Sequence, residues 1–495
     1  MAPLRYSRLK RYRISNDVLM SILEWLDPRS LFMASKAFKR IYGIVMEYHS
    51  LRYKLELAVS GMRDGIAPRA AAPLLGRLHL LLSYRTDWPR LSWTHEYKMQ
   101  LITPSHLGTS GGFIHQIRPH GAYDTVEITE LPSCRTGRSP TLTRRLRFTS
   151  PPIETICIDA SQALIVATHI FCQAGIIGVQ FHFRDLWTFG KHPRAPAESY
   201  EIPTQSVAAV SRATISIFGS KMAMTLEFLG GKTNHLIMDW RNFGARWIDD
   251  PDIRLLDEDL LLVLCKRGSS APIINLCSIS NIANMVVLRQ YELPGTWNNS
   301  TITFCANYSS RLPSASAMFY SDPAQRILVI SAKPSPKSSS RSWLFVNEGY
   351  FRYAPSRRDR FVVPWSVWGQ YCLVKDLARS RTAVRGPYAV GSRIVFLECE
   401  SGASAGCLKT IEFAPFPDDP ARLDPSWSVV GPRSALFPSE SARRLPSSTL
   451  EHYAVDDIGV TEDNIILFLE LQPGFRPVNI LTFGVPQSPP RPSRR

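Results

Sequence analysis

The residues of this chain that could carry out chemistry begin with a serine between glycines. Gly108, Ser110 and Gly112 fit the G-x-S-x-G spelling of a hydrolase nucleophile elbow, in which a strand-to-helix turn exposes the serine hydroxyl. The residues that follow, FIHQI, alternate like a strand and do not start a helix. The sequence therefore predicts a glycine-rich hairpin turn at Ser110, without a catalytic serine.

Two further candidate sites fail for similar reasons. Residues 231–233, Gly-Lys-Thr, match the end of a phosphate-binding loop, but Leu226 replaces its first glycine and NHLIMDW follows, so we expect a turn. His115 and His120 have no acidic ligands at metal-binding spacing, and none of the nine cysteines forms a Cys-x-x-Cys pair. We predict no catalytic residue, metal site, cofactor or disulfide, and expect the cysteines to be reduced.

The elements that would position any site begin with three amphipathic stretches whose apolar residues recur with a helical period. The first ends at Asp27-Pro28, and Ser15 can cap its N-terminus. A second stretch runs from its expected N-cap, Ser30, to Val45, and a third covers residues 51–62. The apolar stripe of the first stretch consists of Ile14, Val18, Leu19, Ile22, Leu23 and Leu26.

A helical bundle this small buries little surface by itself, so its apolar stripe is a candidate docking surface. Several short segments follow one another here in a recognisable order: Leu26-Asp27-Pro28, Ser30-Leu31, Ser35-Lys36, residues 53–58 (YKLELA), residues 61–65 (GMRDG) and residues 88–93 (WPRLSW). This order resembles fungal F-box proteins that carry a large β domain behind the F-box. One departure is visible, because Ile14-Ser15 stands where family members usually have Leu-Pro.

The resemblance implies a non-enzymatic adaptor. The N-terminal helices would dock a Skp-type adaptor and, through it, a cullin, making the chain the substrate-recognition subunit of an SCF-type ubiquitin ligase. The β domain would then bind a protein substrate that the sequence does not identify. The residues predicted to contact the Skp-type adaptor are Ile14, Ser15, Val18, Leu19, Ile22, Leu26, Leu31 and Ala34.

The remaining four fifths of the chain predict an all-β domain. A strand, a tight polar turn and a strongly apolar second strand recur, with turn centres 38 to 71 residues apart. We expect a β-propeller in which the second strands pack between blades; seven blades are favoured, and six to eight fit the spacing. A pair of β-sandwiches is the competing fold. The turn centres are Ser110 (between YKMQLIT and GGFIHQI), Ser161, Ser220, Glu258, Asp322 (between SAMFY and RILVIS), Gly391 and Glu462.

The fold class is therefore multidomain, with a small all-α F-box module before a large all-β domain. The domain boundaries follow from the change of pattern near residue 99. We predict a basic arm at 1–12, the F-box at 13–50, a helical connector at 51–98, the β-propeller-like domain at 99–485 and a basic tail at 486–495.

Charge and hydropathy limit the other functions that the chain could have. Residues 1–98 hold 17 Lys and Arg against 8 Asp and Glu, and the last ten add three Arg, so the β domain carries only +4 of the net +16. This distribution argues against a nucleic-acid partner for the main domain. No apolar run reaches a membrane span or a secretory signal, which predicts a cytoplasmic or nuclear protein.

Two alternatives stay open at this point. The first is a propeller scaffold, or a nucleic-acid or chromatin-associated protein, whose F-box is degenerate and whose basic arm supplies the contact. The second is an enzyme site in the central channel of the propeller, which would require convergent carboxylates or a metal there.

Overall fold

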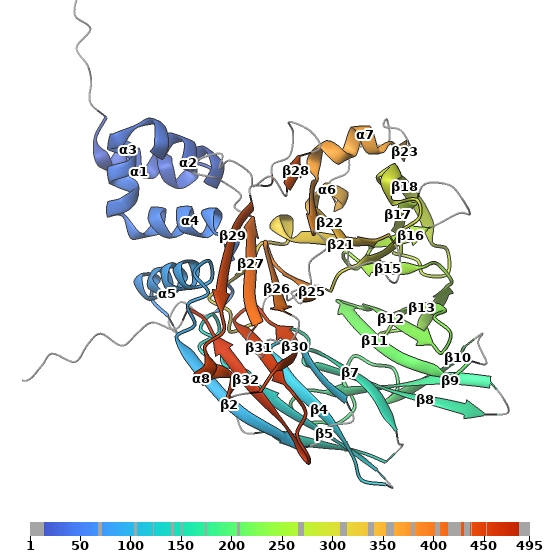
Figure 1. Cartoon of the computed structure of the whole chain (residues 1–495). Coiled ribbons are helices and arrows are strands. Elements are labelled where there is room, and N and C mark those ends of the chain that lie inside the picture. Colours follow the sequence, from blue (N-terminus) through green and yellow to red (C-terminus); the bar gives the residue numbers. More distant parts are fainter. Residues whose placement is uncertain are drawn as a thin grey trace, which may run out of the picture.

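The computed structural model places a group of helices beside a ring of β-sheets (Figure 1). Within the part of the chain that it describes, no helix combines the length and the apolar character needed to cross a membrane. The structure describes residues 14–67, 72–102, 106–121, 123–139, 143–149, 152–173, 176–204, 208–265, 272–306, 314–334, 341–352, 361–377, 382–400, 406–413, 427–429, 436, 438–451 and 453–484. The predicted basic arm and basic tail lie outside these ranges.

The sequence predicts the N-cap of the first helix correctly, but not that of the second. Ser15 caps the first helix as expected, because its Oγ accepts a hydrogen bond from the Val18 N–H. The prediction that Ser30 caps the second helix is wrong: Asp27 caps it, accepting from the N–H groups of Arg29 and Ser30. The helices are α1 (Asn16–Trp25), α2 (Pro28–Ala37), α3 (Lys39–Glu47), α4 (His49–Val59) and α5 (Leu74–Asp87).

The second predicted stretch is two helices and not one. Phe38 has extended backbone angles, φ −130° and ψ 111°, so the chain bends there and α3 starts in a new direction. At the end of the third stretch, Met62 lies outside α4, in the short strand β1 (Met62–Asp64). These breaks let α1, α2, α3 and the start of α4 pack around one small core.

The rest of the chain is a seven-bladed β-propeller, as the sequence predicts. The described residues form seven sheets of four or five strands, and neighbouring sheets contact one another around a closed ring (Figure 1). Blades 1 to 3 are β3 (His106–Ser110), β4 (Phe113–Pro119), β5 (Asp124–Glu130) and β6 (Arg144–Phe148); β7 (Ile153–Asp159), β8 (Leu164–Gln173), β9 (Ile176–Asp185) and β10 (Ser199–Pro203); and β11 (Val210–Phe218), β12 (Lys221–Phe228), β13 (Thr233–Asp239) and β14 (Gly244–Ile248).

Blades 4 to 6 also contain four antiparallel strands, and blades 4 and 5 each add an outer strand, parallel to its neighbour in blade 4 and antiparallel in blade 5. Blade 4 is β15 (Asp252–Leu255), β16 (Leu260–Cys265), β17 (Ile273–Ser278), β18 (Val286–Glu292) and β23 (Val362–Val363); blade 5 is β19 (Thr301–Phe304), β21 (Ile327–Lys333), β22 (Arg341–Asn347), β24 (Leu373–Leu377) and β28 (Trp427–Val429); blade 6 is β25 (Thr382–Val390), β26 (Arg393–Glu400), β27 (Gly406–Phe413) and β29 (Pro438–Arg444).

Blade 7 closes the ring with a strand from the other end of the domain. β2 (His95–Ile102) pairs with β32 (Phe475–Thr482), so the outermost strand of the last blade comes from the start of the propeller. The blade is completed by β31 (Asn464–Leu469) and β30 (Val455–Val460). Short connecting elements are α6 (Gly349–Arg352), α7 (Trp365–Trp368), α8 (Ser447–Leu450), η1 (Gly295–Trp297), η2 (Pro323–Gln325) and η3 (Gly369–Tyr371).

Two of the seven predicted hairpins are wrong in their pairing. YKMQLIT belongs to β2 and pairs with β32, while the partner of β4 is β3. The end of SAMFY belongs to β20 (Phe319–Ser321), which pairs with β1 of the N-terminal region, and β19 is the first strand of blade 5. The other predicted hairpins are confirmed, around Ser161, Ser220, Glu258, Gly391 and Glu462.

The second strand of each hairpin lies buried between neighbouring blades, as expected. β31 is buried at every position, and Leu164 to Ala167 of β8 are fully inaccessible. The strands nearest the axis are the first ones, such as β7 and β11, and these line the central channel. The channel is therefore surrounded by strands with mixed polar and apolar side chains.

Candidate functional site

Helix α1 divides its apolar residues between an inner and an outer surface. Leu23 is buried, and Leu19 and Leu26 pack against the same core. Ile14, just before the helix, and Val18, Ile22 and Trp25 point the other way and expose 49%, 51%, 47% and 90% of their surface. We call these four residues the α1 face. Such a row of exposed large side chains is typical of a surface that a partner covers.

The structure separates the eight residues predicted to contact a partner. Ile14, Val18 and Ile22 lie together on the α1 face, and exposed Ser15 caps the helix beneath them. Leu31 is wholly inaccessible, so it supports the module from within and cannot touch a partner directly. The three remaining residues are half-buried; they are Leu19, Leu26 and Ala34.

Four exposed side chains were not among the predicted contact residues. Trp25 follows Val18 and Ile22 at positions i+7 and i+3, so the helical period alone would have found it. Met33 on α2, Phe38 between α2 and α3, and Tyr42 on α3 are 60%, 61% and 52% exposed, and the direction of α3 depends on the bend at Phe38. The module therefore presents more apolar surface than its first helix.

Two basic side chains connect the helices of this small module by hydrogen bonds. Arg40 on α3 donates to the Asn16 side chain at 2.8 Å and to the Ile14 carbonyl, which holds the start of α1 against α3. Lys54 on α4 donates to the Glu24 carbonyl at 2.8 Å and to the Leu26 carbonyl. The buried apolar residues of the module are Leu23, Leu31, Phe32, Ile44, Val45, Leu51 and Leu55.

Helix α4 belongs to two cores at once. Leu51 and Leu55 close the core of the helical module, whereas Tyr53 and Leu57 pack into the large core shared with blades 6 and 7. The Tyr53 hydroxyl donates to Asp64 at 2.9 Å. Because a helix is stiff over its length, α4 fixes the α1 face relative to the propeller.

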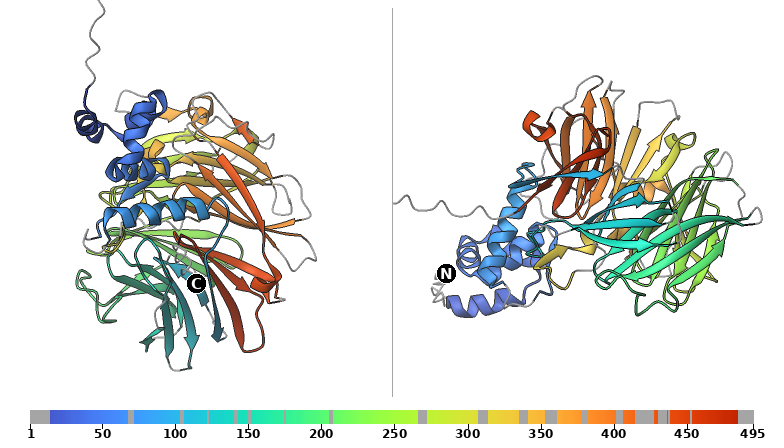
Figure 2. Two further views of the ribbon diagram at one scale, coloured as in Figure 1. Left: turned by 90° about the vertical axis from the view of Figure 1, so that its left-hand side faces the viewer. Right: turned by 90° about the horizontal axis from the view of Figure 1, so that it is seen from below.

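The strand β1 adds a second connection to the propeller. It pairs with β20, which lies between the first two strands of blade 5 in the sequence, and Gly65 follows β1 with its N–H bonded to the Met318 carbonyl at 2.8 Å. A Cβ at Gly65 would stand 1.9 Å from the Ala317 carbonyl oxygen, so only glycine permits this approach. Figure 2 shows the helices gathered on one side of the ring as a result.

Helix α5 is anchored more deeply than the others. Trp88, which follows it, stacks on Phe483 of blade 7 with ring centroids 3.9 Å apart, and the Arg393 guanidinium lies 4.1 Å from the same indole ring. The Tyr84 hydroxyl donates to the Glu462 carbonyl in the first turn of blade 7. The N-terminal region thus packs on the turns between the first and second strands of blades 5 to 7.

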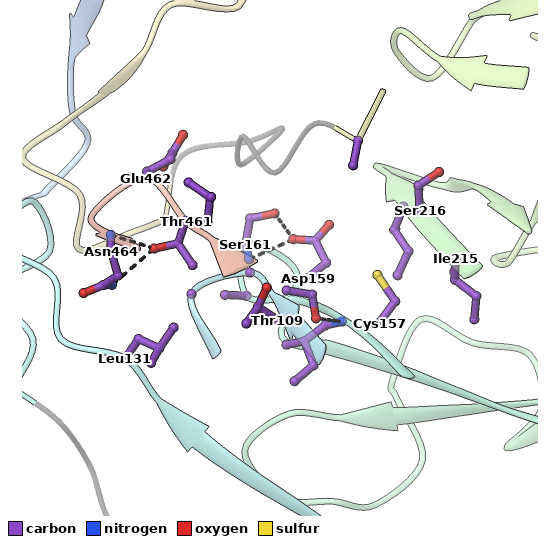
Figure 3. A pocket seen from close by; sticks show the side chains of 18 of the residues that line it. Thr109, Leu131, Cys157, Asp159, Ser161, Ile215, Ser216, Thr461, Glu462 and Asn464 are labelled. Carbon is purple, nitrogen blue, oxygen red and sulfur yellow. Dashed lines mark hydrogen bonds between the residues drawn. The ribbon is translucent and has the colours of Figure 1, made fainter. Parts of the chain in front are cut away.

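A second candidate site is the axial cavity of the propeller, of about 410 Å³. Figure 3 shows Ser161, Asp159, Ser216 and Glu462 around it. Its carboxylates have internal partners: Asp159 accepts from the Ser161 hydroxyl and Gln162, and Asp463 accepts from Arg135 at 2.9 Å. No group of three or more His, Cys, Asp or Glu among the described residues could hold a metal ion.

Burial raises the pKa of two cavity side chains that could act as a nucleophile or an acid, Cys157 and Asp252. Burial raises the pKa of the Cys157 thiol to about 12, so the thiolate is not populated near neutral pH. Burial also raises the pKa of Asp252 to about 6, and that carboxylate accepts the Phe304 N–H at 2.7 Å, which joins blade 4 to blade 5.

The motifs for which the sequence predicts no catalytic or metal-binding role lie in or beside hairpin turns or on buried strands. Ser110 is the last residue of β3, directly before the Gly111-Gly112 turn to β4, and its Oγ accepts the Ile158 N–H of blade 2 at 2.9 Å. Gly231 and Lys232 lie in the turn between β12 and β13, and Thr233 begins β13. His115 is fully buried on β4, and burial lowers its pKa to about 3. All nine cysteines are free thiols.

This chain is similar to several solved structures, at low sequence identity. Neither protein-family models nor curated proteins match this chain. Among solved structures, it is similar to the uncharacterized protein lmo1340 from Listeria monocytogenes EGD-e, with 11% identity, coverage of 75% of this chain and 90% of that one, and a TM-score of 0.40. It is also similar to the WD40 domain of coronin from Toxoplasma gondii (10% identity, 80% and 88% coverage, TM-score 0.38) and to the WD40 domain of SCAP from fission yeast (10%, 77% and 86%, 0.36). These likenesses are too low to argue from, and the assignment of seven blades rests on the sheets of this chain.

Proposed function

We propose that this chain is an F-box substrate-recognition subunit of an SCF-type ubiquitin ligase. The observation that carries the proposal is the α1 face, where three predicted contact residues and Trp25 stand exposed together. A Skp-type adaptor would cover this face and link the chain to a cullin. The ligase would act in the cytoplasm or nucleus, and the propeller would bind its protein substrate.

The rigid join between module and propeller supports this role. A substrate held on the propeller would keep a fixed position relative to the adaptor, because α4 and the β1–β20 pair connect the two parts. Ubiquitin transfer then becomes faster because the effective concentration of the substrate near the ubiquitin-loaded partner is raised. The proposal gives this chain no catalytic residue of its own.

The direct test is co-purification of the full chain with a Skp-type adaptor. Replacing Val18 and Ile22 together by aspartate places two charges on the α1 face, so we expect the adaptor to be lost. Trp25→Ala should weaken binding by about 2 kcal/mol, the cost typical of a central aromatic anchor. Neither change touches the buried core of the module.

The matched control is Leu229→Asp, because Leu229 is 67% exposed on the turn after β12 and far from α1 in sequence and fold. It should retain the adaptor fully. The proposal is wrong if the Val18→Asp, Ile22→Asp variant binds the adaptor as well as the Leu229→Asp variant does.

The second candidate is a propeller scaffold whose helical module has lost adaptor docking, with residues 1–13 binding an acidic polymer such as nucleic acid. Its supporting observation is the concentration of positive charge in the first 98 residues. Salt-dependent retention on heparin that disappears when residues 1–13 are deleted would favour this function over the first.

A further inference from the structure

An exposed tryptophan on blade 2 forms a surface that the proposed adaptor contact does not use. Trp187, on the loop between β9 and β10, exposes 51% of its surface. The Arg144 guanidinium of blade 1 lies 4.9 Å from the Trp187 ring and 5.4 Å from the Phe189 ring. We call Arg144, Trp187 and Phe189, with the exposed Lys191 and Arg194 of the same loop, the Trp187 surface.

Hydrogen bonds within the loop and to Arg144 fix the position of Trp187. The Asp185 carboxylate accepts from the Trp187 N–H at 2.9 Å and from the Thr188 N–H at 2.8 Å. Phe189 has φ of 61°, a conformation costly for an aromatic residue, and its N–H donates to the Asp185 carbonyl at 2.9 Å. Arg144 also donates to the Leu186 carbonyl at 2.9 Å. A side chain immobilised in advance loses little entropy on binding.

The charge around Trp187 is positive, because the nearby acids already have partners. Glu198 pairs with Arg184, and Glu127 pairs with Arg118 at 2.6 Å and with Arg145 at 2.8 Å. Asp185 faces its own loop. The exposed cations Lys191 and Arg194 therefore favour an acidic occupant around an apolar centre.

The position of this surface suits a substrate of the proposed ligase. Strands alternate in direction within a blade, so the loop after the third strand lies at the same end as the turn after the first. The N-terminal helices pack on the first turns of blades 5 to 7, so the Trp187 surface lies on that same face of the ring, over blades 1 and 2. A protein bound there would be on the side of the α1 face.

We infer that the Trp187 surface binds an acidic segment of a protein substrate, with an apolar side chain of that segment packed on the Trp187 ring. The inference rests on the proposed function only in that the bound protein is a substrate of the ligase. The surface and its chemistry are independent of the adaptor. Arg144 would orient the indole ring, and Lys191 and Arg194 would attract the acidic side chains.

The test uses the full chain and a fluorescently labelled peptide that carries one leucine between two runs of glutamate. A second peptide has glutamine in place of each glutamate, and a third probe is a labelled single-stranded RNA. We expect the glutamate peptide to bind and the glutamine peptide to bind at least about tenfold more weakly. Trp187→Ala should weaken the glutamate peptide at least about tenfold, and Lys191→Glu with Arg194→Glu should do the same.

The control is Leu229→Ala, which removes an exposed apolar side chain from another turn and should leave binding unchanged. Equal binding by the wild type and the Trp187→Ala variant overturns the inference, as does tighter Trp187-dependent binding of the RNA. The Val18→Asp, Ile22→Asp variant separates the two hypotheses, since it should keep the peptide and lose the adaptor. If the wild type fails to bind the adaptor but binds the peptide through Trp187, only the proposed function falls.

Discussion

The helical module, formed by α1 to α3 and the start of α4, and the propeller differ in how completely they bury their apolar side chains. The module buries seven hydrophobic residues in its core, and it leaves Trp25, Met33 and Phe38 more than half exposed. The propeller buries continuous clusters between its blades, and Leu164 to Ala167 of β8 are wholly inaccessible. A small bundle has too much surface for its volume to cover all its apolar groups, whereas each blade is covered by two neighbours.

The largest expected effect comes from buried charges of the propeller, where blade 1 meets blade 7 beside helix α5. Arg135 is buried and pairs with Asp463 at 2.9 Å and with Glu462, whose carbonyl also accepts from Tyr84 of α5. Arg135→Met leaves the buried Asp463 carboxylate without its cation and removes one partner of Glu462, so we expect a loss of about 3–5 kcal/mol in the free energy of unfolding. Thermal and denaturant unfolding measure it.

The control for this prediction is Arg145→Met, which removes a cation that is 71% exposed and pairs with Glu127. Its expected effect is below about 1 kcal/mol, because solvent screens exposed ion pairs. Equal losses in the two variants would show that burial of the Arg135 contact between blades 1 and 7 adds no stability beyond that of an exposed ion pair.

A cavity in the module should weaken only the module. Leu31→Ala removes a fully buried side chain from the core of α1 to α3, so the local free energy of opening should fall by about 3 kcal/mol. Hydrogen exchange should accelerate in α1 to α3 and stay constant in the blades. Met33→Ala, at a position 60% exposed, is the matched control. Faster exchange throughout the blades would contradict the separation of the two cores.

Acid should weaken the propeller through His115. Burial lowers its pKa from 6.5 to about 3, so between these values the unfolded chain binds a proton that the folded chain does not. Stability therefore falls as the pH falls below 6.5, and from pH 7 to pH 5 the loss is on the order of 2 kcal/mol.

His115→Gln should abolish that part of the acid sensitivity, which unfolding curves at the two pH values would measure. The exposed His95 is the control, since His95→Gln should keep the wild-type dependence on pH. An unchanged pH slope in the His115→Gln variant would refute the prediction.

The smallest expected effect concerns the α1 face. Ile22→Ala removes a side chain that is 47% exposed and lies outside the module core, so the free energy of unfolding should change by no more than about 0.5 kcal/mol. Compared with Leu31→Ala, the result tells whether exposed apolar residues of the module contribute to its stability. A loss as large as that of Leu31→Ala would mean that the α1 face is structural.

The sequence predicts best what is local. The turns at Ser161, Ser220 and Gly391 are confirmed because a hairpin needs only adjacent strands and a polar turn. The prediction at Asp322 is wrong for the opposite reason: β20 has a strand-like sequence, but its partner β1 comes from the N-terminal region. Similarly, β2 finds its partner β32 at the far end of the chain. Pairings over such separations leave no periodic signal.

By itself, the sequence determined the helical period of α1, its Ser15 cap and the recurrence of β-hairpins that makes a propeller. The tertiary structure decided which apolar residues of α1 stay outside, because the bend at Phe38 and the double role of α4 select the side that is covered. It also decided that Trp187 stands beside Arg144, since those residues belong to different blades. Periodicity is a property of neighbouring residues, whereas exposure depends on what the distant chain packs against each face.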